Sequence, residues 1–520
     1  MKKILYLAIL FGGLFTVSCS NDWLLEEGPS VTTVDDFFTS EAAAEQCINA
    51  VYTPISWEFN DTYYNEWFIG DVMSDDALKG GQTISDMADA YDLENWKTNT
   101  NNTLILDYFR AQYMGTSRAN LAIEQISAME VSDDVISQEM KDRLLGEAYF
   151  LRAMYYFRLV RAFGGVPLVD WVIYSDDEWQ QPRATADEVY ELILADLAIA
   201  ESGLWLKSEY DSEDTGRATK GAAQAMLLKV NLYLGNYADA IAWGEKVIAS
   251  QEYSLQPDYA DLYFEAYENG VESVFEIQYM EDAYSDYGDG NGFTRGTFTT
   301  IMCRSRSTNL GGGWGFNMPT NNLYDSYDDG DPRRDWTIYT PAEADMTNET
   351  EETYLESTKY LNRKLMMLDK DDTIIALAHN SRSPLNRPLI RYADVLLMYA
   401  EALIENGQEG DALTYVNEVR QRAINTPCLD GSAATIELLS SVDRETLRAE
   451  RRAELAMEGH RWFDLCRWGI AKETMDAYIL TENESVQSNS STFVEGQHEL
   501  LPIPSAEIEL NPLMEQNPGY

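Results

Sequence analysis

The sequence is poor in the residues that most often carry catalysis and metal binding. Its 520 residues include three histidines and five cysteines, and no two cysteines form a C-x-x-C pair. The motifs H-E-x-x-H and G-x-S-x-G and the phosphate-binding P-loop are also absent. These absences exclude the usual zinc signatures and a disulfide framework, and they leave histidine-dependent catalysis few candidates.

Basic residues are scarce as well. Lysine and arginine total 38 against 88 aspartates and glutamates, which gives a formal net charge of -50. Nucleic acids and anionic lipid surfaces bind through lysine and arginine, so this balance argues against both as partners. It favours a solvated acidic surface that keeps a secreted protein soluble, with cation binding as the alternative.

Long apolar runs are absent apart from one near the N-terminus. Lys2 and Lys3 precede the apolar residues 4–17, a stretch too short to span a bilayer as a helix. This pattern predicts a signal peptide over residues 1–18, and the cysteine that follows predicts lipidation at Cys19. Plain secretion is the alternative, and no other segment reaches the length of a transmembrane helix.

What the sequence does contain is a set of amphipathic helix pairs. After Arg391, apolar residues recur at helical spacing until two glycines break the pattern, and a second apolar face follows. Residues 221–249 repeat this arrangement around a turn at Gly235, which matches tetratricopeptide chemistry. The irregular spacing of the pairs excludes a regular solenoid. We therefore predict a mostly α-helical, tetratricopeptide-like scaffold of helix hairpins over about residues 30–250 and 386–475.

Residues 255–385 interrupt this scaffold with the largest loop-rich excursion. Residues 273–279 alternate in the manner of a short strand, so minor β structure is expected. The glycine-rich, aromatic and polar runs that follow cannot form a long helix. Because long loops on a rigid frame commonly carry function, we expect ligand specificity to reside in this excursion.

Four blocks of the sequence resemble, in the same order, the hallmark segments of the SusD/RagB family of nutrient-binding surface lipoproteins: residues 391–402, 417–423, 450–469 and 501–520. The resemblance implies one SusD-like domain over residues 19–520 that ends in a hallmark tail at 498–520. It also implies a lipid anchor in the outer membrane, with the protein facing the cell exterior. Such a protein captures a glycan or oligosaccharide and passes it to a SusC-like TonB-dependent transporter.

Aromatic residues in polar loops are the candidate ligand-binding residues. A sugar offers an apolar C–H face, on which flat rings stack, and hydroxyl groups, which amide and carboxylate side chains bind. In starch-binding relatives the glycan lies on an aromatic arc, and Trp96 and Trp314 resemble members of that arc. The alternative for each aromatic is a packing role inside its loop. The predicted glycan-binding residues are Trp96, Asn99, Asn101, Tyr284, Tyr287, Trp314 and Phe316.

Two acidic loops suggest metal binding. Asp286, Asp289 and Asn291 share one polar loop and are the candidate calcium ligands, and no other cofactor is predicted. The second loop, from Asp328 to Arg334, lacks the spaced ligands of an EF-hand. It resembles the recurrent D-P-R block of the family, so we predict a structural turn there.

Two other functions remain open on this evidence. The family includes binders of peptides and other non-sugar nutrients, which take part in the same type of uptake complex. A glycoside hydrolase needs two suitably spaced carboxylates, and among 88 acidic residues such a pair arises by chance. Since no catalytic motif is present, a binding protein is predicted rather than an enzyme.

Overall fold

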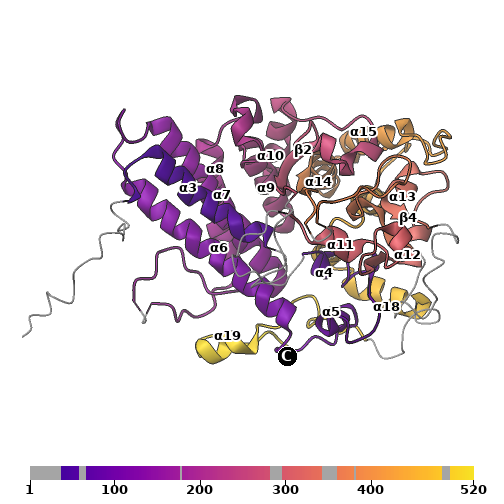
Figure 1. Ribbon diagram of the computed structural model, residues 1–520, viewed down its shortest axis with the longest axis horizontal. Helices are drawn as coiled ribbons and strands as arrows, with labels where there is room; N and C mark the ends of the chain where they lie inside the picture. Colours follow the sequence, from indigo (N-terminus) through magenta and orange to yellow (C-terminus); the bar gives the residue numbers. More distant parts are fainter. Residues whose placement is uncertain are drawn as a thin grey trace, which may run out of the picture.

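Helices dominate the computed structural model, which describes residues 37–57, 66–175, 178–281, 296–341, 360–379, 382–482 and 492–520. Side-by-side helices fill one half of the molecule, and the short helices, strands and loops of the excursion gather in the other (Figure 1). The predicted fold class, a helical scaffold with loop-rich excursions and minor β structure, is confirmed. The predicted signal peptide and Cys19 lie outside the described residues. Of the helices described, none is both long and apolar enough to cross a membrane.

Several of the longer helices begin after a serine, threonine, asparagine or aspartate whose side chain caps the first turn. At the start of α8, for example, Thr185 and Glu188 form a reciprocal capping box that satisfies two backbone N–H groups. The longer helices are α3 (Glu41–Tyr52), α6 (Thr103–Ala128), α7 (Gln138–Phe163), α8 (Ala186–Gly203), α9 (Lys220–Tyr233), α10 (Tyr237–Ser250), α14 (Tyr392–Glu405), α15 (Glu409–Asn425), α16 (Arg444–Leu455) and α18 (Ala471–Glu482). The shorter ones are α4 (Trp67–Gly70), α5 (Ala88–Glu94), α11 (Thr299–Cys303), α12 (Asn321–Asp325), α13 (Pro332–Thr337), α17 (Arg461–Arg467) and α19 (Ser505–Leu510).

Helices that are consecutive in the chain pack against one another. α6 packs on α7, α7 on α8 and α8 on α9, while α9 pairs with α10 and α14 pairs with α15. α10 also packs against α14, which joins the N-terminal and C-terminal helix pairs (Figure 1). The hairpins predicted around Gly235 and after Arg391 are therefore confirmed as α9–α10 and α14–α15.

Short antiparallel strand pairs tie the excursion to the scaffold. Within the described residues, β1 (Ala77–Gly80) pairs with β3 (Phe316–Pro319), β2 (Ser273–Ile277) with β6 (Arg387–Arg391), and β4 (Ile338–Tyr339) with β5 (Leu361–Asn362). The strand predicted over residues 273–279 is β2. Its pairing with β6 brings the two ends of the excursion together at the base of α14. The β1–β3 pair brings the loop after β1 beside the loop that precedes β3.

The acidic run around Asp331 is a structural turn, as predicted. The Asp331 side chain caps α13 by accepting the backbone N–H of Arg333 at 3.0 Å, and Pro332 occupies the first helical position. The Arg333 side chain folds back onto Asp331 and also donates to Glu450 on α16 at 2.6 Å. This D-P-R block therefore attaches α13 to α16.

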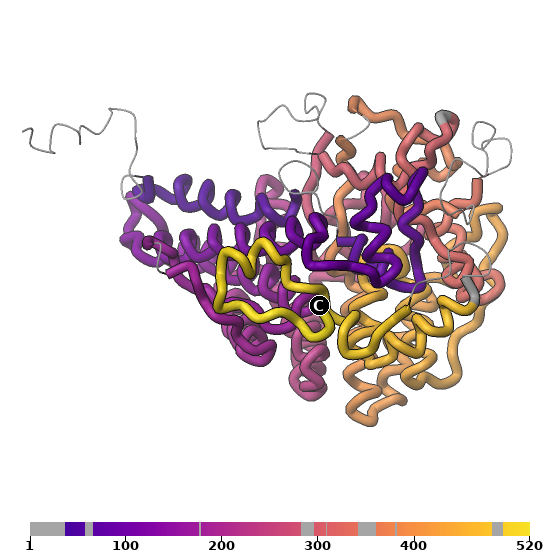
Figure 2. Tube along the Cα trace, turned by 90° about the horizontal axis from the view of Figure 1, so that it is seen from below, coloured from indigo at the N-terminus to yellow at the C-terminus, as the bar shows by residue number. Residues whose placement is uncertain are grey.

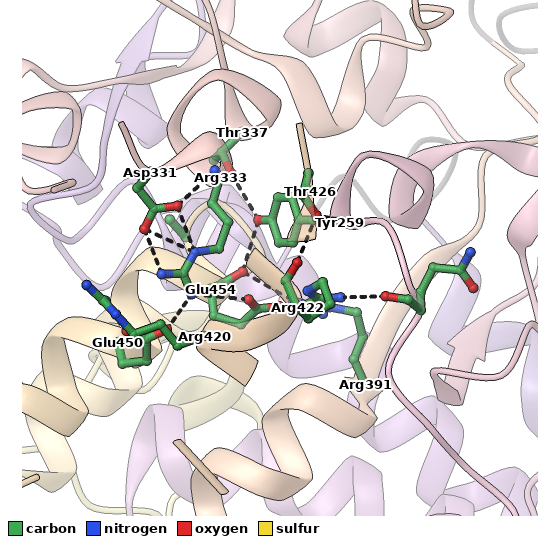
Figure 3. Close-up of polar contacts among 12 residues, drawn as sticks. Tyr259, Asp331, Arg333, Thr337, Arg391, Arg420, Arg422, Thr426, Glu450 and Glu454 are labelled. Atoms are coloured by element: carbon green, nitrogen blue, oxygen red, sulfur yellow. Dashed lines mark hydrogen bonds and ion pairs between the residues drawn. The ribbon is translucent and has the colours of Figure 1, made fainter. Parts of the chain in front are cut away.

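Glu454 on α16 lies at the centre of a buried charge network (Figure 3). Its carboxylate accepts from Arg391 at 3.0 Å and from Arg333 at 3.4 Å, and Arg422 donates to the same group. A buried carboxylate is stable only where such partners replace its lost hydration. Because the three arginines come from β6, α13 and α15, the network holds these elements onto α16.

The C-terminal tail runs back along the N-terminal helices, as the yellow segment of Figure 2 shows. Asn517 anchors it, because its amide donates to the carbonyls of Phe163 at 3.0 Å and Leu501 at 2.7 Å. Asn511, which follows α19, donates to the carbonyl of Gln181 at 2.7 Å. The tail is therefore held against the end of α7 and the loop between α7 and α8.

Candidate functional site

The structure buries Trp96, contrary to the prediction of an exposed stacking ring. Trp96 is 6% exposed, and its indole packs edge-on against Phe493 at a centroid distance of 5.8 Å. Phe493 in turn packs against Trp462, so this indole belongs to the hydrophobic core. Trp96 lies just past the end of α5, whose residues Ala90 and Leu93 face the same core. The prediction of a stacking surface at Trp96 is therefore wrong.

Asn99 and Asn101 are exposed at the turn before α6. The Asn99 side chain accepts the backbone N–H of Asn101 at 2.9 Å and so shapes this turn. The Asn101 side chain forms a hydrogen bond of 2.5 Å with the Ser505 hydroxyl in the C-terminal tail. Both amides thus have a structural role here, and a ligand-binding role for them stays a prediction.

Phe316 is also buried, because β3 carries it into the core. It is 1% exposed, and the ammonium of Lys79 lies 5.6 Å from its ring centroid. Gly81 leaves space for the ring, since a Cβ atom added there would lie 2.5 Å from it. The prediction that Phe316 offers its ring to a ligand is therefore wrong. The other predicted residues, Tyr284, Tyr287, Asp286, Asp289 and Asn291, lie outside the described residues.

Trp314 is the predicted aromatic that, within the described chain, keeps part of its surface exposed. Its indole is supported edge-on by Phe298 at a centroid distance of 5.0 Å and by Phe316 at 6.3 Å. Its loop is held in place because the N–H of Gly81 donates to the carbonyl of Gly315 at 2.8 Å. A fixed ring with an accessible part is what stacking on a sugar requires.

Polar side chains gather at the backbone of Trp314. Arg306 donates to the carbonyl of Trp314 at 3.1 Å and to the side-chain oxygen of Gln82 at 3.3 Å, and it forms an ion pair with Asp86 at 3.6 Å. We call Gln82, Asp86, Arg306 and Trp314 the Trp314 surface. Amide, carboxylate and guanidinium groups bind hydroxyls while the indole binds C–H groups, so this surface combines the two chemistries of a glycan site.

Sequence reasoning misses Gln82, Asp86 and Arg306. Gln82 and Asp86 lie far from Trp314 along the chain, and Arg306 lies in a polar segment with no distinguishing feature. No local sequence pattern connects the three residues with Trp314. The β1–β3 register, in which Gly80 lies opposite Phe316, is what brings the two loops together. The one available signal is the glycine-rich run around Trp314, which indicates close approach of another chain segment.

Comparisons with known proteins match nearly the whole chain. The family model described as "SusD family" matches residues 271–520, and the model described as "Starch-binding associating with outer membrane" matches residues 22–232. SusD-like protein P2 of Formosa agariphila is 28% identical over 535 residues, which cover 100% of this chain and 99% of that protein. Starch-binding protein SusD of Bacteroides thetaiotaomicron is 26% identical over 437 residues, 73% of each chain. The structure of a laminarin binding SusD-like protein matches with a TM-score of 0.77 at 28% identity, covering 93% of this chain and 100% of that one.

Proposed function

The chain belongs to the SusD family, and we propose that it binds a glycan at the cell surface and delivers it to a SusC-like TonB-dependent transporter. Family membership is the observation that carries this proposal. The two matched regions include both loops of the Trp314 surface, residues 81–86 and 304–316. The names of two relatives point to starch and laminarin as the glycans to test first.

Binding at the Trp314 surface proceeds without a chemical step. The accessible part of the Trp314 ring stacks on the C–H face of a sugar, while Arg306, Gln82 and Asp86 exchange hydrogen bonds with its hydroxyls. Phe298 already holds the ring, and Arg306 is held by its own contacts, so binding orders few additional side chains. Affinity then depends on the stacked area and on how many hydroxyls find a partner.

The same proposal places the protein in the outer membrane, facing the cell exterior. Removal of residues 1–18 leaves residues 19–520 as a single domain, with lipid on Cys19 as the anchor. Metabolic labelling with a palmitate analogue tests this: the wild type should incorporate label, and Cys19→Ala should incorporate none. Label on both forms, or on neither, contradicts the anchor.

Trp314→Ala is expected to weaken glycan binding about tenfold or more, since loss of a stacked ring costs on the order of 1.4 kcal/mol. Isothermal titration calorimetry with starch-derived and laminarin-derived oligosaccharides measures the change. Trp243→Ala is the matched control, because Trp243 is a partly buried tryptophan on α10, away from this loop. It should leave glycan affinity unaltered. Equal affinities of wild type and Trp314→Ala would mean that the glycan binds elsewhere.

The same preparations separate the alternative functions. A binder of non-sugar nutrients would give no heat of binding with any oligosaccharide in calorimetry. It would instead bind members of a peptide panel, and Trp314→Ala would abolish that binding. A glycoside hydrolase would release reducing sugar from starch or laminarin on prolonged incubation. We expect oligosaccharide binding, no Trp314-dependent peptide binding and no release of reducing sugar.

A further inference from the structure

A concave surface lies on the helical scaffold, between α6, the loop that follows α7, and α19. Its cavity has a volume of about 430 Å³, within the range of about 300–1,000 Å³ that is typical of ligand pockets. Figure 2 shows the yellow tail that carries α19 lying along the N-terminal helices. We call this cavity the α6–α19 groove. Its prominent lining residues are Tyr113, Met114, Trp171, Ile173, Trp179 and Leu510.

The groove exposes an unusual concentration of large apolar side chains. Met114 is 47% exposed, Ile173 is 42% exposed and Leu510 is 53% exposed, and both tryptophans, Trp171 and Trp179, are also more than one-third exposed. Isolated exposed apolar residues are common, but a contiguous set around one cavity marks an interaction site. Tryptophan and methionine are also enriched at protein interfaces.

Most polar side chains that line the groove are already bonded within the protein. The Tyr113 hydroxyl donates to the carbonyl of Pro167 at 2.8 Å. The Asn120 amide donates to the carbonyls of Val169 at 2.8 Å and Trp171 at 2.9 Å, and its oxygen accepts from an arginine on α7. A sugar hydroxyl placed on this floor would lose water without gaining an equivalent partner, at a cost of about 1–3 kcal/mol for each group. The floor therefore favours apolar side chains over a glycan.

Exposed acidic residues adjoin the lining residues of the groove along the chain. Asp170, Glu509 and Glu515 are exposed, and each is the direct neighbour of a lining residue. The nearby cations are already engaged: Arg110 pairs with a glutamate of α19 at 2.6 Å, and Arg183 donates to backbone carbonyls. Complementary potentials favour an occupant that carries lysine or arginine beside its apolar residues. A second copy of a chain with a net charge of -50 is disfavoured for the same reason.

We propose that the α6–α19 groove docks a polypeptide segment of a partner protein whose large apolar side chains are flanked by lysine or arginine. The apolar side chains of the partner fill the space between Met114, Trp171 and Leu510. They lose their contact with water there, as the anchor residues of protein interfaces do. The flanking lysine or arginine side chains face the carboxylates of Asp170, Glu509 and Glu515. This interaction is independent of glycan binding at the Trp314 surface, from which it differs in location and in chemistry.

Selection of a random phage-displayed peptide library on the purified protein tests the groove. The wild type should enrich peptides that combine large apolar residues with lysine or arginine. Synthetic versions should bind the double variant Ile173→Asp/Leu510→Asp about tenfold or more weakly, because two carboxylates then occupy an apolar site. Fluorescence anisotropy measures both affinities. Both substituted residues are well exposed, so neither change alters the core.

The matched control is Leu438→Asp/Leu480→Asp, which adds the same charge at exposed leucines outside the groove, 49% and 75% exposed respectively. It should bind the selected peptides as the wild type does. The proposal is overturned if the selected peptides bind the groove variant equally well or if they are acidic. Loss of oligosaccharide affinity in Trp171→Ala would overturn it as well, because the groove would then be a sugar site. Titration of Ile173→Asp/Leu510→Asp with oligosaccharide distinguishes the peptide-binding groove from the glycan site, because this variant should bind glycan as tightly as the wild type does.

Discussion

Glu454→Ala is expected to lower the free energy of unfolding by about 3–5 kcal/mol, because removing one partner of a buried ion pair leaves the other uncompensated. Glu454 is fully buried and accepts hydrogen bonds from Arg333, Arg391 and Arg422 (Figure 3). Burial alone raises the pKa of Glu454, but the charges of Arg422 and Arg391 outweigh it and lower the pKa. Without this carboxylate, the guanidiniums remain in surroundings that solvate charge poorly. Chemical denaturation at neutral pH measures the loss.

A partly exposed ion pair provides the matched control. Glu405 pairs with Arg444, which is 62% exposed, and pairs of this kind contribute about 0–1 kcal/mol. Glu405→Ala should therefore leave the unfolding transition nearly unchanged. Similar transitions for Glu405→Ala and Glu454→Ala would contradict the role assigned to the buried network.

Acidification should produce the second large effect. Burial raises the pKa of Asp464, but the positive charges of Arg451 and Arg467 outweigh burial and lower it to about 2. An aspartate in the unfolded chain has a pKa of about 3.9. The stability that Asp464 contributes is therefore complete above about pH 5 and is lost as the pH falls through about 2. The pKa values of Asp394, Glu454 and Glu458 are also lowered by nearby positive charges. The stability that these three carboxylates contribute is therefore also lost on acidification.

Unfolding free energies between about pH 7 and pH 2.5 test this expectation. Each unit by which the folded and unfolded pKa values differ corresponds to about 1.4 kcal/mol, so the ionised Asp464 contributes roughly 2–3 kcal/mol to the free energy of unfolding at neutral pH. Asp464→Asn should be less stable than the wild type at neutral pH, and the difference should shrink as both are acidified. Asp476→Asn is the control, since Asp476 is 49% exposed and pairs with a partly exposed lysine. A difference that stays constant from neutral to acidic pH would rule out the ionised Asp464 as its source.

The buried charges also support the proposed ligand site. Asp75 pairs with Arg461 at 2.7 Å, and Asp76 pairs with Arg452 at 2.7 Å, directly before β1. β1 holds β3, and together they bring the two loops of the Trp314 surface side by side. Ion pairs from α16 and α17 thus hold the start of β1, the strand on which the Trp314 loop is positioned through β3.

Features that depend on neighbouring residues were predictable. Apolar residues at helical spacing identified α9–α10 and α14–α15, because one face of each helix must be buried. The D-P-R block identified its turn, since the Asp331 cap and the proline at the first helical position act within a few residues. The family resemblance depended on the same local blocks, and the family matches confirm it.

The candidate site was less predictable. Trp96 is followed by an asparagine-rich polar segment that suggests exposure, yet Phe493 from the far end of the chain covers it. Trp314 lies in a comparably polar, glycine-rich loop and remains partly exposed. Local composition does not distinguish these two tryptophans, and it contains no sign of the α6–α19 groove.

The sequence by itself determined the helical hairpins, the family and the kinds of residue available to bind a sugar. Only the tertiary structure decided which aromatic rings reach solvent and which polar groups are already bonded. The physical reason is that helix formation follows from the spacing of neighbouring residues, whereas burial depends on which distant segment packs over a side chain.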